Sequence, residues 1–189
     1  MTTVYFVRHA QPNYDNHNDL TRELTEKGLA DRKLVTAYLA DKNIHAVYSS
    51  PYHRSIDTVK DFADTKDLPI TIVDDFRERK IDSVWIEDFN AFCIQQWADF
   101  SYKLSDGESL GEVQARNIAA LEQVVAAHDG ENIVVGSHGT ALSTIINHYD
   151  PTFGHAEFET IRALMPWIVK FEFDGTDCVG IEKINVFAL

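Results

Sequence analysis

Short apolar runs that alternate with stretches of helical periodicity constrain the fold of this chain most. The runs are rich in β-branched and aromatic residues, which favours strands, and they cover residues 3–7, 44–48, 70–73 and 133–135. Apolar residues at steps of three and four predict helices from Thr25, through 56–63, over 84–102, from 109 to 125, over 140–148 and over 155–165. Two further runs, 167–173 and 178–187, flank Asp174-Gly175 and predict an antiparallel hairpin. This order predicts an α/β fold, a three-layer α/β/α sandwich around a mainly parallel sheet with a C-terminal antiparallel hairpin.

Length and composition predict a single domain that spans residues 1–189. A chain of 189 residues suffices for one well-packed domain and is marginal for two. Hydrophobic residues make up 44% of it, enough to bury a core. We find no linker rich in proline and glycine, no internal repeat and no low-complexity run.

The charge balance limits the classes of partner. There are 17 basic and 30 acidic residues, a net charge of −13, which argues against a broad nucleic-acid or anionic-membrane surface. No apolar stretch approaches the roughly 20 residues of a membrane helix, and Met1-Thr2-Thr3 leads directly into an apolar run without a basic leader. We therefore expect a cytoplasmic protein with no nucleic-acid or membrane partner. Neither the two cysteines nor the eight histidines show a metal-binding spacing, so we expect no metal and no cofactor.

Two histidines follow predicted strands, at the edge of a parallel sheet where α/β proteins place their chemistry. His9 follows the first apolar run and His138 follows the run at 133–135. A neutral imidazole can attack an electrophile, and a cationic one can hold an anion. Arg8 precedes His9 and supplies a planar fork of donors suited to phosphate. The pair therefore predicts a nucleophile beside a phosphate-binding group.

Four short motifs, in this order and structural context, resemble the histidine phosphatase superfamily, also called the phosphoglycerate mutase-like family. They are Arg8-His9-Ala10, Ser50-Pro51-x-x-Arg54, Gly107-Glu108-Ser109 and Ser137-His138-Gly139. Relatives usually carry glycine where this chain has Ala10. With the strand order, the resemblance covers nearly the whole chain and implies the same fold.

The resemblance implies a phosphohistidine mechanism that needs no metal. His9 would be the nucleophile, while Arg8, Arg54 and His138 would hold the phosphoryl group. Glu78 would be the proton donor, because relatives place an acid after a strand at this point and an aromatic residue, here Trp85, several positions later. The rival acids are Asp74, Asp75 and, less favoured, Glu108.

Weaker predictions concern the rest of the pocket. In the loop after His9, Pro12 and Asp15 replace residues through which relatives contact phosphate, so Asn13 and Asn16 become the candidates there. Gly139 would let a ligand approach closely. The aromatic segment 84–102 would serve either as a substrate-facing cap or as ordinary core.

Three functions are compatible with these residues. The leading one is a phosphomonoesterase acting on a small phosphorylated substrate. A phosphoglycerate mutase is less favoured, because residues 79–105 carry three basic and four acidic side chains instead of the basic insertion of mutases. The third is a phospho-ligand-binding protein without catalysis, which the complete set of candidate catalytic residues argues against. The substrate and the oligomeric state stay open.

Overall fold

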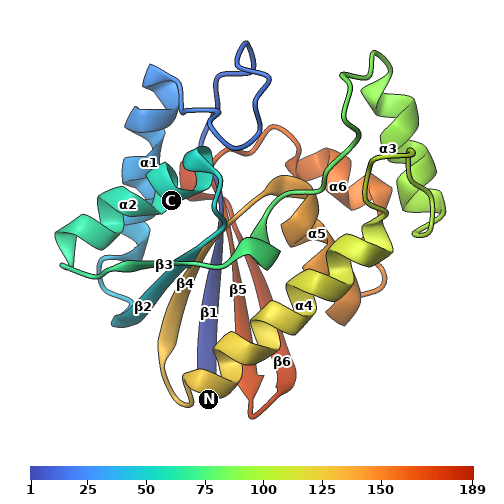
Figure 1. Cartoon of the computed structure of the whole chain (residues 1–189). Helices are drawn as coiled ribbons and strands as arrows, with labels where there is room; N and C mark the ends of the chain where they lie inside the picture. Colours follow the sequence, from blue (N-terminus) through green and yellow to red (C-terminus); the bar gives the residue numbers. More distant parts are fainter.

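The computed structural model describes residues 1–189 and contains one six-stranded sheet with the order β3-β2-β4-β1-β5-β6 (Figure 1). The strands are β1 (Thr2–Arg8), β2 (Ile44–Ser49), β3 (Ile70–Ile72), β4 (Asn132–Ser137), β5 (Trp167–Asp174) and β6 (Asp177–Ile184). The first four are mutually parallel, and β5 and β6 form an antiparallel hairpin at one edge. The predicted mainly parallel sheet with a terminal hairpin is confirmed.

Helices cover both faces of this sheet. They are α1 (Glu26–Leu39), α2 (His53–Thr65), α3 (Phe89–Ala98), α4 (Leu110–Ala127), α5 (Gly139–Tyr149) and α6 (His155–Ile161), with short 3₁₀ turns at Asp74–Phe76 and Val186–Ala188. Successive side chains of β1 point to opposite faces, as in any strand. Val4 and Phe6 join the core under α4, α5 and α6, whereas Tyr5 and Val7 join the core under α1 and α2. The three predicted layers are therefore present.

Local hydrogen bonds set where the helices begin. A capping box begins α4, since the Ser109 amide donates to Glu112 Oε2 at 2.9 Å and the Glu112 amide donates to Ser109 Oγ at 3.1 Å. The prediction of one helix over 84–102 is wrong at both ends. Asp88 caps α3 by accepting from the Ala91 amide at 2.9 Å, which leaves residues 84–88 as a loop.

Two C-terminal boundaries also differ from those predicted. The helix predicted over 155–165 ends at Ile161, four residues short, and the chain turns towards Pro166, which has no amide hydrogen to continue a helix. The second hairpin strand ends at Ile184, before a 3₁₀ turn. None of the helices combines the length and apolar character that crossing a membrane requires.

The centre of the sheet positions the candidate site. Strands β1 and β4 are neighbours, and Arg8 pairs with Ser137 in their parallel register. The residues that follow, His9 and His138, therefore leave the same edge of the sheet side by side. Adjacent parallel strands thus bring together two motifs that lie about 130 residues apart in sequence.

Candidate active site

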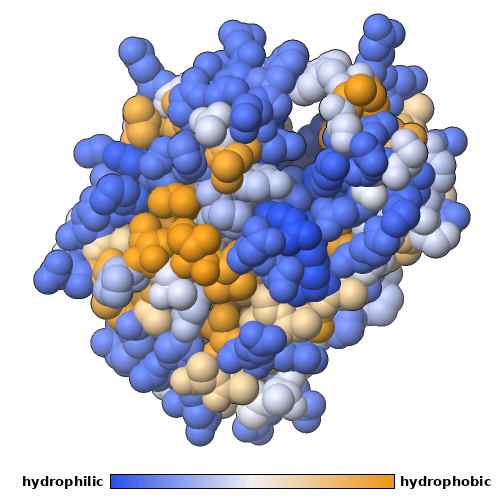
Figure 2. Space-filling model, viewed as in Figure 1, coloured by the Kyte–Doolittle hydropathy of each residue, from blue (hydrophilic) through white to orange (hydrophobic).

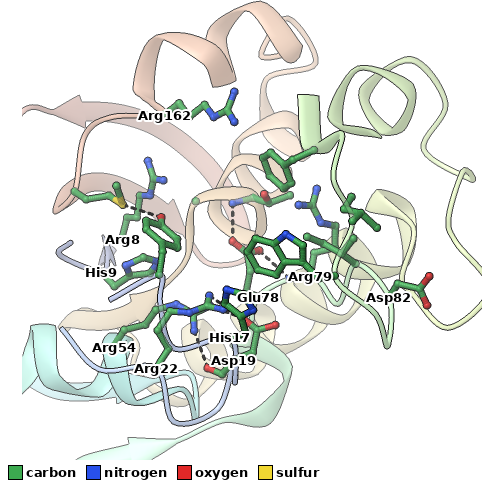
Figure 3. Close-up of a pocket in the computed structure, with 18 of the residues that line it drawn as sticks. Arg8, His9, His17, Asp19, Arg22, Arg54, Glu78, Arg79, Asp82 and Arg162 are labelled. Atoms are coloured by element: carbon green, nitrogen blue, oxygen red, sulfur yellow. Dashed lines mark hydrogen bonds and ion pairs between the residues drawn. The ribbon is translucent and has the colours of Figure 1, made fainter. Parts of the chain in front are cut away.

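A cavity of about 700 Å³ opens beyond the carboxyl end of β1 (Figure 3). One side, the near wall, contains Arg8, His9, Asp19, Arg22 and Arg54. The other side, the far wall, contains Arg79, Trp85, Phe89 and Arg162. Glu78 lies between the two walls. A cavity of this size suits a small metabolite.

A main-chain carbonyl fixes the tautomer of His9. The ring is almost fully buried, and its Nδ1 lies 2.8 Å from the Ala10 carbonyl oxygen. Because a carbonyl oxygen can only accept, Nδ1 carries the hydrogen and the neutral ring keeps its lone pair on Nε2. Burial, followed by the charges of Arg54 and Arg8, lowers the pKa of His9 well below its ordinary value. His9 is therefore a neutral imidazole with a free nitrogen, the form that a nucleophile needs.

His138 lies behind His9 and does not line the cavity. The two ring centroids are 5.3 Å apart, and the His138 side chain has no exposed surface. Its Nε2 is 2.7 Å from Ser50 Oγ, while its Nδ1 is buried without a hydrogen-bond partner. Burial and then the charge of Arg54 lower the pKa of His138 well below its ordinary value. Its predicted role in holding the phosphoryl group stays a prediction.

Gly139 makes room for Arg8. Arg8 Nη1 donates to the carbonyl oxygens of Ile161 at 2.7 Å and Leu164 at 3.2 Å, which fixes the guanidinium at the cavity. A Cβ at position 139 would lie 2.9 Å from Arg8 Cζ, closer than such contacts occur. We expected the missing side chain to admit a ligand, but the space is filled by the guanidinium.

Asp19 bridges the two other near-wall arginines. Arg54 Nη1 donates to the Asp19 carbonyl oxygen at 2.7 Å, and Arg54 Nη2 lies 3.4 Å from Asp19 Oδ1. Arg22 Nη1 also donates to Asp19 Oδ1, at 3.1 Å, and Arg22 Nε donates to the Asn16 carbonyl oxygen at 2.7 Å. Sequence reasoning missed Arg22, because it lies in an irregular loop without a motif of its own.

Main-chain amides hold Glu78 at the start of α5. Its Oε2 accepts from the Thr140 amide at 3.0 Å, and its Oε1 accepts from the Ala141 amide at 2.9 Å and the Arg79 amide at 2.8 Å. A helix N-terminus is a favourable place for a carboxylate. The rival acids Asp74, Asp75 and Glu108 do not line the cavity.

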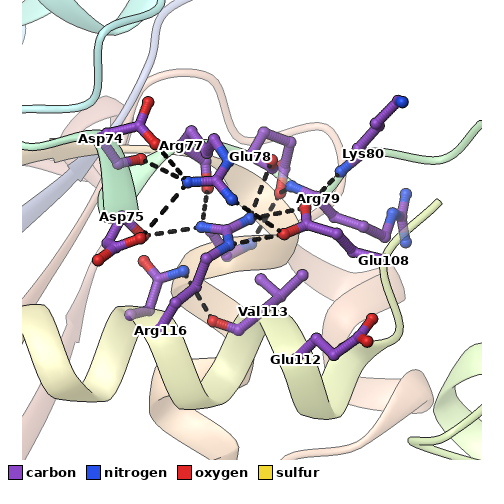
Figure 4. Close-up of polar contacts among 12 residues, drawn as sticks. Asp74, Asp75, Arg77, Glu78, Arg79, Lys80, Glu108, Glu112, Val113 and Arg116 are labelled. Atoms are coloured by element: carbon purple, nitrogen blue, oxygen red, sulfur yellow. Dashed lines mark hydrogen bonds and ion pairs between the residues drawn. The ribbon is translucent and has the colours of Figure 1, made fainter. Parts of the chain in front are cut away.

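Arg116 and Glu108 clamp the main chain that carries Glu78 (Figure 4). The Arg116 guanidinium donates to the carbonyl oxygens of Asp75 at 2.7 Å, Arg77 at 2.8 Å and Glu78 at 3.2 Å. Glu108 accepts from Arg116 Nε and Nη2 at 2.8 and 2.9 Å. Burial alone would raise the pKa of Glu108, but the hydrogen bonds from Arg116 and the Lys80 amide lower it. The Gly107-Glu108-Ser109 turn thus supports the segment that carries the candidate acid.

Comparison with known families agrees with this geometry. The family model described as "Histidine phosphatase superfamily (branch 1)" matches residues 4–180. The chain belongs to the histidine phosphatase superfamily. It is 30% identical over 162 residues to the metal-independent phosphoserine phosphatase of Arabidopsis thaliana, covering 77% of this chain and 67% of that protein. It is 27% identical over 175 residues to a probable phosphoglycerate mutase of Yersinia pestis, covering 83% of this chain and 79% of the relative.

Solved structures share the fold. Bacillus stearothermophilus YhfR superposes with a TM-score of 0.80 at 23% identity, and 94% of each chain is covered. A phosphoserine phosphatase mutant from Entamoeba histolytica, solved with phosphoserine, superposes with a TM-score of 0.75 at 19% identity and 96% coverage of each chain. These matches establish a histidine phosphatase fold for the chain.

Asn13 and Asn16, two of the weaker predictions, do not line the cavity. Asn13 Nδ2 donates to Glu23 Oε1 at 2.6 Å, and Asn16 Nδ2 donates to Glu23 Oε2 at 2.8 Å. These two hydrogen bonds lower the pKa of Glu23 to about 2. Neither asparagine side chain lines the cavity, so the amides order the loop after His9.

The aromatic segment both lines the cavity and packs inward. Trp85 and Phe89 line the far wall, whereas Phe92 is buried. Trp85 is 64% exposed, and its ring stacks on His17 with centroids 4.2 Å apart and planes at 10°. This stack joins the two walls at the rim. Sequence reasoning left open whether the segment faces the pocket, because its spacing fits both roles.

Proposed function

We propose that this protein is a metal-independent phosphomonoesterase that forms a phosphohistidine on His9. The observation that carries the proposal is the hydrogen bond from His9 Nδ1 to the Ala10 carbonyl oxygen, which leaves Nε2 free beside Arg8 and Arg54. The similarity to a metal-independent phosphoserine phosphatase supports hydrolysis of a phosphate ester.

The proposed reaction has two displacements at phosphorus. In the first, the Nε2 lone pair of His9 forms a bond to phosphorus while the bond from phosphorus to the ester oxygen breaks. Glu78 gives its proton to the departing oxygen, so the alcohol leaves neutral. In the second, water attacks the phosphohistidine, the phosphorus–nitrogen bond breaks, and Glu78 takes a proton from the water. The products are the alcohol and inorganic phosphate, and both residues return to their initial states.

The near-wall cations stabilise the charge that spreads over the phosphoryl oxygens. The guanidinium groups of Arg8 and Arg54 are fixed by hydrogen bonds before substrate arrives, so little reorganisation is needed. His138 would contribute a donor from behind His9. Its Nε2 shares a hydrogen bond with Ser50 Oγ, and its buried Nδ1 has no partner.

Mutase chemistry is the second candidate, since one relative is a probable phosphoglycerate mutase. Hydrolysis is favoured because residues 79–105 are short and carry three basic and four acidic side chains. Incubation with 3-phosphoglycerate separates the two reactions. Exchange of the phosphoryl position without release of phosphate would select the mutase.

The first experiment measures phosphate release from 4-nitrophenyl phosphate in excess chelator. We expect turnover by the wild-type protein and a loss of at least about a thousandfold in His9→Ala, because His9 is the proposed nucleophile and lies beside Arg8 and Arg54. His148→Ala is the matched control, since His148 is exposed on α5 outside the cavity. Activity of His9→Ala within tenfold of the wild type would overturn the assignment.

A further inference from the structure

One side chain joins the main chain beside His9 to helix α2. Thr58 lies in the middle of α2 and has no exposed surface. Its Oγ1 accepts a hydrogen bond from the Ala10 amide at 2.9 Å and donates one to the Arg54 carbonyl oxygen at 2.7 Å. The proposed reaction gives this hydroxyl no task, although it contacts both of the segments that carry His9 and Arg54.

The chemistry of the partners fixes the direction of both hydrogen bonds. A main-chain amide can only donate and a carbonyl oxygen can only accept, so the single hydroxyl hydrogen of Thr58 points to Arg54 and a lone pair faces Ala10. A threonine inside a helix can donate to the carbonyl oxygen four residues earlier wherever the helix lies. That pattern accounts for the bond to Arg54. The bond from Ala10 depends instead on how α2 packs against the end of β1.

The Ala10 amide lies beyond the sheet and needs an acceptor elsewhere. Arg8 is the last residue of β1 that pairs with β4 and β5, and the His9 amide still donates to the Ser137 carbonyl oxygen at 3.1 Å. Ala10 is fully buried, and a buried amide hydrogen without an acceptor is costly. Thr58 thus supplies the acceptor that the sheet no longer provides.

The carbonyl group of Ala10 serves His9. Its oxygen lies 2.8 Å from His9 Nδ1 and keeps the hydrogen of the neutral ring on that nitrogen. The chain is held again one residue later, where the Gln11 carbonyl oxygen accepts from the Thr25 amide at 3.0 Å. Between these two points the Thr58 hydroxyl holds the Ala10 amide. Without the hydroxyl, Ala10 would be free to turn, and its carbonyl oxygen would no longer be held at His9 Nδ1.

Thr58 itself does not meet the substrate. The cavity opens as a hollow in the surface between the loop after His9 and the loop before α3 (Figure 2). Thr58 does not line this cavity. Its influence on the reaction must therefore pass through the residues that it contacts, Ala10 and Arg54.

We propose that Thr58 is a positioning residue for the nucleophile. By holding the Ala10 amide, it keeps the Ala10 carbonyl oxygen at His9 Nδ1, so that the ring hydrogen stays on Nδ1 and the lone pair stays on Nε2. If the hydrogen moved to Nε2, the nitrogen that attacks phosphorus would have no lone pair to give. This inference rests on the proposed function and adds one residue to it.

Variants of Thr58 separate the hydroxyl from the shape of the side chain. Thr58→Val keeps the branched shape and loses the hydroxyl, Thr58→Ser keeps the hydroxyl, and Thr58→Cys replaces it with a weak acceptor. Thr144→Val is the matched control, because Thr144 is also fully buried in a helix, and its hydroxyl donates to the Ala141 carbonyl oxygen at 2.7 Å without holding a main-chain amide. Circular dichroism identifies the variants that fold, and Thr58→Cys decides alone if Thr58→Val does not fold.

Turnover of 4-nitrophenyl phosphate is the first measurement. We expect kcat/KM to fall by about thirtyfold or more in Thr58→Val and by about fivefold or more in Thr58→Cys, and to stay within about threefold of the wild type in Thr58→Ser and Thr144→Val. The inhibition constant of inorganic phosphate should change by less than about threefold throughout, since Arg8 and Arg54 keep their side-chain hydrogen bonds. Equal losses of turnover in Thr58→Val and Thr144→Val would overturn the proposal, and so would equal losses of turnover and of phosphate binding.

Nitrogen-15 NMR of the histidine rings is a second measurement, which a general loss of stability would not change. His9 is neutral at about pH 7.5 because burial lowers its pKa, and the two neutral tautomers differ in their ring nitrogen shifts. The His9 signals are those that disappear in His9→Ala. We expect hydrogen on Nδ1 in the wild type, Thr58→Ser and Thr144→Val, and a population with hydrogen on Nε2 in Thr58→Val and Thr58→Cys. A wild-type tautomer in every folded variant that lacks the hydroxyl would overturn the proposal.

The same measurements separate this inference from the proposed function. If His9→Ala keeps its activity but Thr58→Val shifts the His9 tautomer, the phosphohistidine assignment fails and the positioning of the ring by Thr58 stands. If activity depends on His9 but Thr58→Val matches Thr144→Val in tautomer and turnover, the positioning role fails alone.

Discussion

The two walls of the cavity are built differently. On the near wall, Arg8 and His9 lie at the end of β1 and Arg54 lies in the first turn of α2, and these three residues are each less than a tenth exposed. Asp19 and Arg22 complete this wall from the loop between β1 and α1. On the far wall, Arg79 and Trp85 lie in the loop before α3, Phe89 begins α3, and Arg162 follows α6. Trp85 is largely exposed, whereas Arg79 is buried. Sheet and helix ends can hold groups within the tolerance that phosphoryl transfer needs. Loops and short helices can vary without disturbing that chemistry, which suits the selection of substrate.

Changes at the near wall and at Glu78 should therefore alter the reaction itself, whereas changes at the far wall should alter which substrate is preferred. The following predictions test this division, beginning with the largest effect.

The largest of these effects is expected for Glu78→Gln, and it should depend on the leaving group. An alkyl phosphate needs a proton on its departing oxygen, so kcat/KM should fall by about 10²-fold or more. An activated aryl phosphate leaves without one and should lose less than about tenfold. Rates across a series of leaving-group pKa values measure the difference. Equal losses for both classes would show that Glu78 is not the proton donor.

The same series of leaving groups should be measured on Arg116→Met. Arg116 contacts three carbonyl oxygens around Glu78 but does not line the cavity. We expect a weaker version of the same leaving-group dependence, because the acid would lose its fixed position. A uniform loss on all substrates would instead indicate a general effect on stability.

A smaller effect is expected at the rim. Trp85→Ala and His17→Ala each remove one ring of the stack, so each should change KM by less than about tenfold and leave kcat on aryl phosphates nearly unchanged. The double variant should resemble either single variant, because the stack is one interaction. Additive changes in the double-mutant cycle would show that the two rings contact substrate independently.

The smallest effect concerns stability against pH. Burial lowers the pKa of both His9 and His138, so below about pH 6.5 the unfolded chain binds protons that the folded protein does not. The free energy of unfolding should therefore fall as the pH is lowered from about 6.5 to 5. Each histidine adds at most about 1.4 kcal/mol per pH unit. Urea denaturation of the wild type and His9→Asn measures this slope, and a slope unchanged in the variant would contradict the assignment.

Three of the five near-wall residues were predictable from the sequence, because they belong to motifs that follow apolar runs rich in β-branched residues. Asp19 and Arg22 lie in an irregular loop and were not predicted. His9, Arg8 and Arg54 lie where the strand ends place them. The position of His138 behind His9 depends on side-chain packing, which periodicity does not encode. The Arg8 guanidinium beside Gly139 depends on the same kind of packing.

The far wall was not predictable for a different reason. The start of α3 depends on one cap at Asp88, which removes residues 84–88 from the helix that their spacing suggests. Arg79 follows Glu78 and reads in sequence as a salt-bridge partner for it. Only the buried amide of Gln96, 17 positions later, shows that Arg79 faces elsewhere.

The parallel pairing of β1 with β4 has a consequence for how this protein acquires activity. Four helices, α1 to α4, and two strands lie between His9 and His138 in the sequence, and only the closed centre of the sheet brings the two histidines together. Contacts between such distant segments form slowly, because a long loop must close before they contribute. A partly folded chain should thus hold no partial activity. The recovery of turnover after dilution from denaturant would report on completion of the sheet.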